Sequence, residues 1–145
     1  MRALRIKSSK KPLLTVERSK QWNRRMVYIL VANKTYKYKN GRSPIVYIGT
    51  TGKGAGRPAT SAVDKASEAF ADLHGVKRIE VHIVTCSRRK AMKTWLHLES
   101  ALLYTFRNLY FELPTYNKKK GSAKHTKDRL FRRSALEKLI FQFAP

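Results

Sequence analysis

The chain has 145 residues, 42% of them hydrophobic and 28% charged, which is typical of one globular domain and too apolar for wholesale disorder. Its 32 Lys and Arg outnumber nine Asp and Glu, so the formal net charge is +23 and the expected partner is nucleic acid rather than a membrane. No apolar run reaches the length of a spanning helix, and the single cysteine, Cys86, excludes an internal disulfide or a cysteine-based zinc site.

The first 25 residues form a basic segment. They contain nine basic residues and one acidic residue, Glu17, with little periodicity. This composition predicts an arm that contacts phosphates outside the folded core. An organellar transit peptide would also contain Arg and Ser, but Glu17 and the weak amphipathicity favour the arm. We therefore expect an intracellular protein, either cytoplasmic or nuclear (nucleoid).

Two apolar runs, residues 26–32 and 44–50, are rich in β-branched and aromatic residues, and Asn40 with Gly41 supplies a strong turn signal between them. The pattern predicts an antiparallel hairpin. Strict alternation puts Tyr28 and Tyr47 on one face of it. Their expected neighbours on that face are Leu30, Ile45 and Gly49, and the opposite face should hold Val27, Ile29, Val31, Val46 and Ile48.

The connection between these runs carries aromatic and basic residues in alternation, from Tyr36 to Arg42. This mixture suits contacts with phosphates or exposed bases, and it equally suits a plain extension of the two strands.

A glycine-rich loop follows, with Pro58 at the expected first position of a helix that ends before His74 and Gly75. The loop lacks a P-loop motif, so ATP is not implied. A third strand is predicted from residue 79 to near Cys86, because Ile79, Val81 and Ile83 alternate with polar residues. The apolar stripe expected on the helix is Ala59, Ala62, Val63, Ala66, Ala69, Phe70 and Leu73.

A second helix is predicted from about residue 90 to residue 111, ahead of Pro114, and Glu99 falls inside its apolar stripe. The stripe consists of Met92, Trp95, Leu96, Leu102, Leu103, Phe106 and Tyr110. A carboxylate in such surroundings requires a cation, a metal ion or strong hydrogen-bond donors. An ion pair with Arg57 or Arg107 is one solution, and a metal ion is the other.

The C-terminal part begins with a second basic segment, residues 117–133, and continues into a helix with an apolar side. Histidine spacing gives no zinc site, and Asp64, Glu68 and Asp72 predict a solvated acidic stripe. Together the elements predict an α+β fold, an α/β sandwich with a small, mainly antiparallel three-stranded sheet flanked by helices. The expected division is a basic arm at 1–25, a core at 26–117, and a basic linker with a C-terminal helix at 118–145.

Taken in order, Val27-Tyr28-Ile29, Tyr47-Ile48-Gly49, Arg57, Glu99 and Asn117 resemble the GIY-YIG nuclease family over residues 26–117. The YIG tripeptide is intact. The GIY tripeptide is altered, because its three positions hold Met26, Val27 and Tyr28. Each motif is short, but their common order is specific.

This resemblance implies a metal-dependent DNA endonuclease that hydrolyses phosphodiester bonds. Its catalytic residues would be Tyr28 and Tyr47, which position and deprotonate the attacking water, and Arg57, which holds the scissile phosphate and lowers a tyrosine pKa. Glu99 would ligate one Mg²⁺ or Mn²⁺ ion, and Asn117 would support the site.

Ser61 departs from the family pattern, since many members have a histidine, tyrosine or lysine there, and a serine hydroxyl is a poor acid or base. A non-catalytic structural nucleic-acid-binding protein, ribosome-associated or architectural, therefore stays open as the alternative function. DNA is expected rather than RNA. The nucleic-acid-binding residues are expected to be Lys37, Lys39, Arg42, Lys53, Lys118, Lys119 and Lys120.

Overall fold

The structure, a computed structural model, describes residues 3–17, 25–52, 54, 56–72, 75–117 and 130–144. The strands are β1 (Met26–Tyr38), β2 (Gly41–Thr51) and β3 (Ile79–Val84). The helices are α1 (Gly56–Asp72), α2 (Thr94–Tyr110), the short 3₁₀ helix η1 (Thr115–Asn117) and α3 (Arg133–Phe141). The three strands form an antiparallel sheet in the order β2-β1-β3, so the expected α+β class is confirmed.

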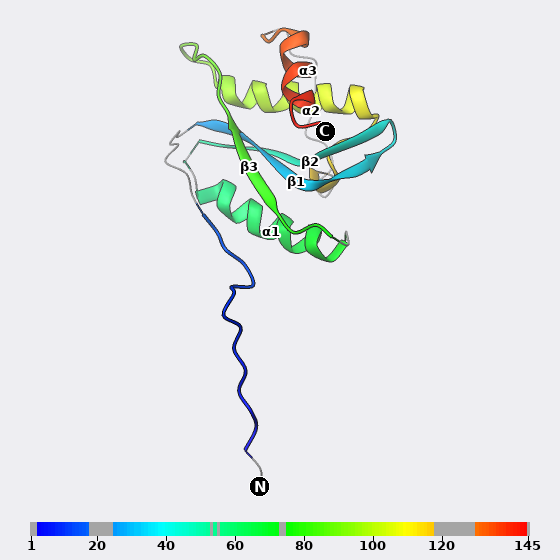
Figure 1. Cartoon of the computed structure of the whole chain (residues 1–145). Coiled ribbons are helices and arrows are strands. Elements are labelled where there is room, and N and C mark those ends of the chain that lie inside the picture. Colours follow the sequence, from blue (N-terminus) through cyan, green and yellow to red (C-terminus); the bar gives the residue numbers. More distant parts are fainter. Residues whose placement is uncertain are drawn as a thin grey trace.

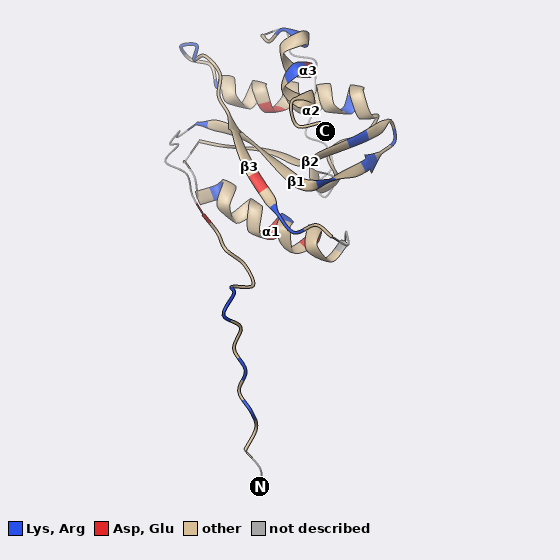
Figure 2. Ribbon diagram, viewed as in Figure 1, with Lys and Arg blue, Asp and Glu red and all other residues tan. Residues whose placement is uncertain are grey.

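The helices cover both faces of this sheet. In Figure 1, α1 lies on one side, whereas α2 and α3 lie on the other. Every residue from 3 to 17 is exposed, and Figure 2 shows several of the basic residues along this segment. None of the helices in the described part of the chain is long and apolar enough to cross a membrane.

The predicted hairpin is confirmed, with Gly41 at the turn in a left-handed conformation (φ +95°) that favours glycine. Tyr28 pairs with Gly49 and Leu30 with Tyr47, as strict alternation requires. A register shift then makes Val31 pair with Ile45. Val31 therefore lies opposite Ile45, which strict alternation assigns to the other face, because a bulge interrupts the period of two.

The aromatic residues of the hairpin extension are not exposed. Tyr36 and Tyr38 are only 7% and 3% exposed and belong to the hydrophobic core. Their expected contact with bases is wrong, and the strand-extension alternative holds. The neighbouring Lys37, Lys39 and Arg42 point to solvent, so the extension presents basic groups on its outer surface (Figure 2).

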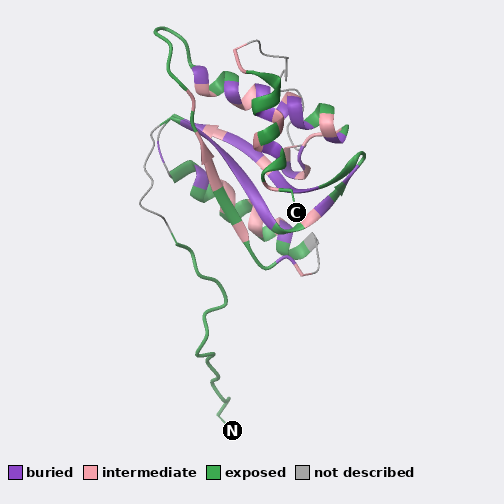
Figure 3. Cartoon of the chain, turned by 45° about the horizontal axis from the view of Figure 1, so that its top comes forward, coloured by how far each residue is buried: buried purple, intermediate pink, exposed green. Residues whose placement is uncertain are grey.

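Helix α1 buries a smaller apolar face than its sequence predicts. Ala69 is fully buried, but Val63 and Phe70 are 54% and 39% exposed. The half-buried positions instead include Ser61 and Lys65 (Figure 3 shows the mixed surface of this helix). Two polar side chains thus replace part of the expected apolar stripe, and both lie near the candidate site described below.

Helix α2 starts four residues later than expected, because the backbone turns at residues 89–92 with Ala91 in the left-handed region (φ 63°). Met92 is therefore outside the helix, and both Met92 and Leu96 are exposed rather than in the stripe. The rest of the stripe holds: Leu102, Leu103, Phe106 and Tyr110 are buried. Leu136 and Ile140 of α3 join the same core, as expected for its apolar side.

Candidate active site

The two tyrosines of the hairpin face meet at the open end of the sheet. Tyr28 is fully buried and Tyr47 is half-buried, with their ring centroids 6.0 Å apart. Gly49 lies directly opposite Tyr28, and a Cβ atom on it would come within 2.7 Å of both tyrosine rings. The glycine is therefore required by the close approach of the two rings rather than by its backbone angles.

Helix α1 brings three polar side chains to these tyrosines at steps of four residues: Arg57, Ser61 and Lys65. This spacing puts them on one side of the helix. The Ser61 and Tyr28 hydroxyl oxygens are 2.9 Å apart and hydrogen-bonded. The Lys65 Nζ lies 5.5 Å from the centre of the Tyr47 ring, a cation–π arrangement.

Glu99 reaches the same place from α2. Its carboxylate is close enough to Tyr47 to raise the pKa of that phenol, and Arg57 acts on both groups in the opposite direction. Burial raises the pKa of Glu99 to about 7, and the charge of Arg57 offsets this only in part. The structure thus brings together Tyr28, Tyr47, Arg57 and Glu99, which come from four different elements, β1, β2, α1 and α2.

Within the described residues, no ion pair or hydrogen bond is found for the Glu99 carboxylate or for the Arg57 guanidinium. The predicted structural alternative, an ion pair with Arg57 or Arg107, is therefore not formed. A half-buried carboxylate without a partner is an unusual and costly arrangement, which calls for a ligand.

The pKa of Tyr47 moves against the sequence-based expectation. Burial raises it to about 12, the neighbouring Tyr28 and Glu99 add to the rise, and Arg57 lowers it too little to compensate. The Tyr47 hydroxyl is therefore protonated at neutral pH in the free protein. It can donate and accept hydrogen bonds, but it cannot remove a proton from water in this state.

Asn117 lies at the outer edge of β2. Its Oδ1 accepts a hydrogen bond from the Ile48 N–H at 2.9 Å, and its Nδ2 donates one to the Ile48 carbonyl at 2.8 Å. Since Ile48 separates Tyr47 from Gly49, the side chain of Asn117 fixes the strand between two site residues. Both of its amide atoms are used, which makes it a positioning residue.

The donor set suits a hard divalent cation held by one carboxylate. Among the described residues no group of three His, Cys, Asp or Glu side chains could hold a metal ion. Mg²⁺ commonly needs only one or two carboxylates, because water and phosphate oxygens fill its other positions. Glu99, which is half-buried and forms no ion pair or hydrogen bond with the residues that the structure describes, meets that requirement.

The expected nucleic-acid-binding residues divide into two groups. Lys37, Lys39 and Arg42 are exposed at the far end of the hairpin, away from Tyr28. Lys53, Lys118, Lys119 and Lys120 lie outside the described residues. An unpredicted basic group, Arg25, stacks over the Trp95 ring at 4.8 Å, directly before β1 and near the open end of the sheet.

Sequence analysis overlooked Lys65, although a signal for it exists. Arg57, Ser61 and Lys65 follow one another at steps of four, so a helix that presents Arg57 to the site must present the other two as well. The apolar stripe assigned to this helix hid that spacing.

No model of a known protein family matches the chain, and searches among curated proteins and among solved structures found no match either.

Proposed function

We propose that this chain is a metal-dependent endonuclease of the GIY-YIG type that hydrolyses phosphodiester bonds, in DNA rather than RNA. The observation that carries the proposal is the meeting of Tyr28, Tyr47, Arg57 and Glu99 in one place, with no ion pair or hydrogen bond between the carboxylate and any described residue. Such a combination offers a phosphate ligand, a metal ligand and two hydroxyl groups. A protein that only binds nucleic acid has no need for a half-buried carboxylate beside phosphates.

Each residue has a separate task in this proposal. Arg57, in the first turn of α1, binds the scissile phosphate together with the free N–H groups at the start of that helix. Glu99 holds the metal ion. When bound there, Mg²⁺ or Mn²⁺ neutralises charge on the phosphate oxygens and makes a nearby water more acidic.

In this proposal the two tyrosines orient the attacking water and do not remove its proton. With a pKa of about 12, the Tyr47 hydroxyl is a neutral phenol that accepts a hydrogen bond from the attacking water. Tyr28, hydrogen-bonded to Ser61, supports Tyr47 through ring contact. The oxygen of water forms the new bond to phosphorus as its proton passes to solvent water, and the bond from phosphorus to the leaving sugar oxygen breaks as that oxygen takes a proton from solvent.

One feature favours a second candidate, the non-catalytic nucleic-acid-binding protein. Ser61 occupies the position at which an acid or base would be expected, and its hydroxyl is engaged with Tyr28. In that case the role of Glu99 would be structural only. The two candidates differ in whether bound nucleic acid is cut.

The deciding experiment exposes supercoiled plasmid, branched DNA and RNA to the protein in Mg²⁺, Mn²⁺ or EDTA. We expect nicking of DNA that requires a metal ion and is lost in Glu99→Gln, while binding persists. Glu80→Gln is the matched control, because Glu80 is an exposed carboxylate on β3. Tight binding without any cutting by the unaltered protein would instead establish the second candidate.

A further inference from the structure

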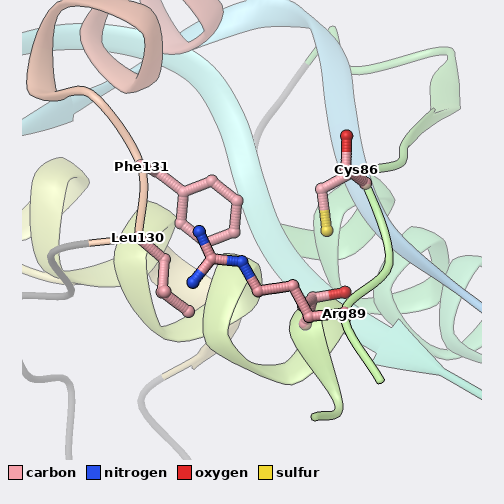
Figure 4. Close-up of a pocket in the computed structure, with 6 residues that line it drawn as sticks. Cys86, Arg89, Leu130 and Phe131 are labelled. Atoms are coloured by element: carbon pink, nitrogen blue, oxygen red, sulfur yellow. The ribbon is translucent and has the colours of Figure 1, made fainter. Parts of the chain in front are cut away.

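A pocket of about 430 Å³ lies beside the start of α2 and shares no residue with the candidate active site. Figure 4 shows it between the segment that follows β3 and the segment that precedes α3. Its volume is within the usual range for small-ligand pockets. Among the residues that the structure describes, the pocket is lined by Cys86, Ser87, Arg89, Thr94, Leu130 and Phe131, and none of these is acidic.

The start of α2 leaves backbone donors available. The residue before the helix, Lys93, makes no side-chain capping hydrogen bond, and its carbonyl accepts from the Leu96 N–H at 3.0 Å. Within the described part of the chain, the N–H groups of Thr94 and Trp95 have no acceptor. Unsatisfied N–H groups and the helix dipole together favour an anion at this end of α2.

The side chain of Thr94 is a second, independent sign of a ligand. Thr94 is only 5% exposed, it lines the pocket, and no described residue hydrogen-bonds with its hydroxyl. Buried hydroxyl groups almost always have a partner, because leaving one unsatisfied is costly. A ligand in the pocket would supply the missing acceptor.

Arg89 and the apolar wall define the rest of the pocket. In Figure 4 the Arg89 guanidinium extends across the pocket toward Leu130 and Phe131. It forms no ion pair with any described residue. The adjoining loop adds the exposed cations Arg88, Lys90 and Lys93, so the surroundings are strongly positive. One side of the pocket is thus cationic and the other is apolar.

We propose that this pocket binds the phosphate of a nucleotide, with the Thr94 hydroxyl, the first N–H groups of α2 and Arg89 as donors. The sugar or base attached to that phosphate packs against Leu130 and Phe131. The ligand is either a free mononucleotide or one nucleotide unit of a nucleic-acid strand. The pocket does not depend on phosphodiester hydrolysis at the other site.

The experiment uses Cys86 as the reporter, because it is the only cysteine of the chain and lines the pocket. The rate of its alkylation is measured in the full chain with inorganic phosphate, with deoxyadenosine monophosphate and with a short single-stranded oligothymidylate, all at constant ionic strength. We expect at least one phosphate-bearing probe to slow alkylation. Protection by the monophosphate identifies a free nucleotide as a ligand, and protection by the oligonucleotide alone identifies a strand.

Two variants test the assigned donors. Thr94→Val and Arg89→Gln should each raise the half-saturating concentration by about tenfold or more, the usual effect of removing a hydrogen bond to a charged group. Arg88→Gln, which removes a neighbouring cation outside the pocket, is the matched control and should have a much smaller effect. The Tm of Thr94→Val should stay equal or rise, since the lost hydroxyl has no hydrogen-bond partner among the described residues.

Two results would overturn the proposal. The first is unchanged alkylation with all three probes. The second is protection that weakens equally in Arg88→Gln and Arg89→Gln and not at all in Thr94→Val, because that pattern reports general electrostatic attraction. Neither result bears on plasmid nicking, so the failure of this pocket and the failure of the proposed nuclease activity are distinguishable.

Discussion

The two ends of the β1–β2 hairpin carry two tyrosines each, yet the chain treats them differently. At the turn end, the Tyr38 hydroxyl donates to the Ile45 carbonyl at 2.6 Å, and the hydroxyl groups of Tyr36 and Tyr116 lie 2.9 Å apart. At the open end, Tyr28 and Tyr47 stand beside a carboxylate and a guanidinium without ion-pair partners among the described residues. The same residue type therefore completes a core at one end and lines an unsatisfied polar site at the other.

Within one hairpin, the tyrosines with a structural role thus differ from those of the candidate site. At the turn end, burial raises the pKa of Tyr38 to about 12, but hydrogen bonds with Thr115 and Ile45 use its hydroxyl. At the open end, the pKa of Tyr47 is equally high, but the neighbouring Glu99 and Arg57 side chains have no ion-pair partner among the described residues. We conclude that the candidate site is identified by its polar groups without partners among the described residues, and not by a raised tyrosine pKa alone.

The largest effect is expected from Gly49→Ala, which would damage the open end alone. The added Cβ would approach the rings of Tyr28 and Tyr47 to 2.7 Å. Moving the rings should cost at least about 100-fold in nicking rate and about 1–3 kcal/mol of stability. Gly56→Ala is the matched control, because its Cβ meets nothing within 4 Å. Nicking assays and thermal unfolding measure both quantities, and full activity in Gly49→Ala would contradict the assigned ring arrangement.

The next effect concerns Glu99→Gln and its dependence on pH. The pKa of Glu99 is about 7 in the folded protein and 4.5 ordinarily, so the folded state binds more protons than the unfolded state between these values. Stability of the unaltered protein must therefore fall as pH rises through that window. At about pH 8 the glutamine variant should be more stable by about 1–3 kcal/mol, and at about pH 4 the difference should vanish.

Denaturant titrations at both pH values measure this difference. Saturating Mg²⁺ or Mn²⁺ should raise the Tm of the unaltered protein and leave that of Glu99→Gln unchanged. The affinity for the ion should weaken below about pH 7, since protonation of Glu99 competes with it. A destabilised Glu99→Gln at high pH would indicate a structural ion pair instead.

A smaller, reciprocal effect is expected from removing one hydroxyl at each end. Tyr38→Phe should lose about 1–2 kcal/mol of stability, because the Ile45 carbonyl and the Thr115 N–H lose a partner. Its nicking rate should be unchanged. Tyr47→Phe should keep its stability within about 0.5 kcal/mol and lose about 100-fold in nicking rate. Equal losses of stability in Tyr38→Phe and Tyr47→Phe would contradict the proposed difference between the two ends of the hairpin.

The smallest effect is assigned to Lys65, whose cation lies over the Tyr47 ring. Lys65→Met keeps most of the side-chain length and removes the charge. DNA binding should weaken a few-fold, and the slope of log Kd against log salt should fall by about one. Lys138→Met, in the last turn of α3, is the control. Fluorescence anisotropy over a range of salt concentrations measures both slopes, and identical slopes would remove Lys65 from the phosphate contacts.

Much of the fold follows from sequence patterns. The hairpin, its turn at Asn40 and Gly41, the third strand and the apolar side of the C-terminal helix are all visible as periodicity. The errors arise where a long-range contact overrides that periodicity. The alternation of Tyr36 and Tyr38 with basic residues suits base binding as well as a strand extension, but the two tyrosines pack against Tyr116 and Phe106, which lie far away in the chain.

The residues of the candidate site could be predicted from the sequence, but the direction of their pKa shifts could not. Strand alternation puts Tyr28 and Tyr47 on one face, the resemblance to the GIY-YIG family adds Arg57 and Glu99 to them, and the structure brings the four together. The direction of the Tyr47 pKa could not be read from the sequence, since it depends on how burial and the charge of Arg57 balance. Lys65 was overlooked because hydrophobic patterning gives priority to apolar positions.

The pair of hydrogen bonds between Asn117 and Ile48 has a consequence for the sheet edge. One amide side chain takes the place of a fourth strand, because it satisfies an N–H and a C=O that would otherwise be open to a second polypeptide. A shortened chain that ends before Thr115 would expose that edge. Such a fragment should be prone to self-association, so the boundary of a minimal folded core must lie beyond Asn117.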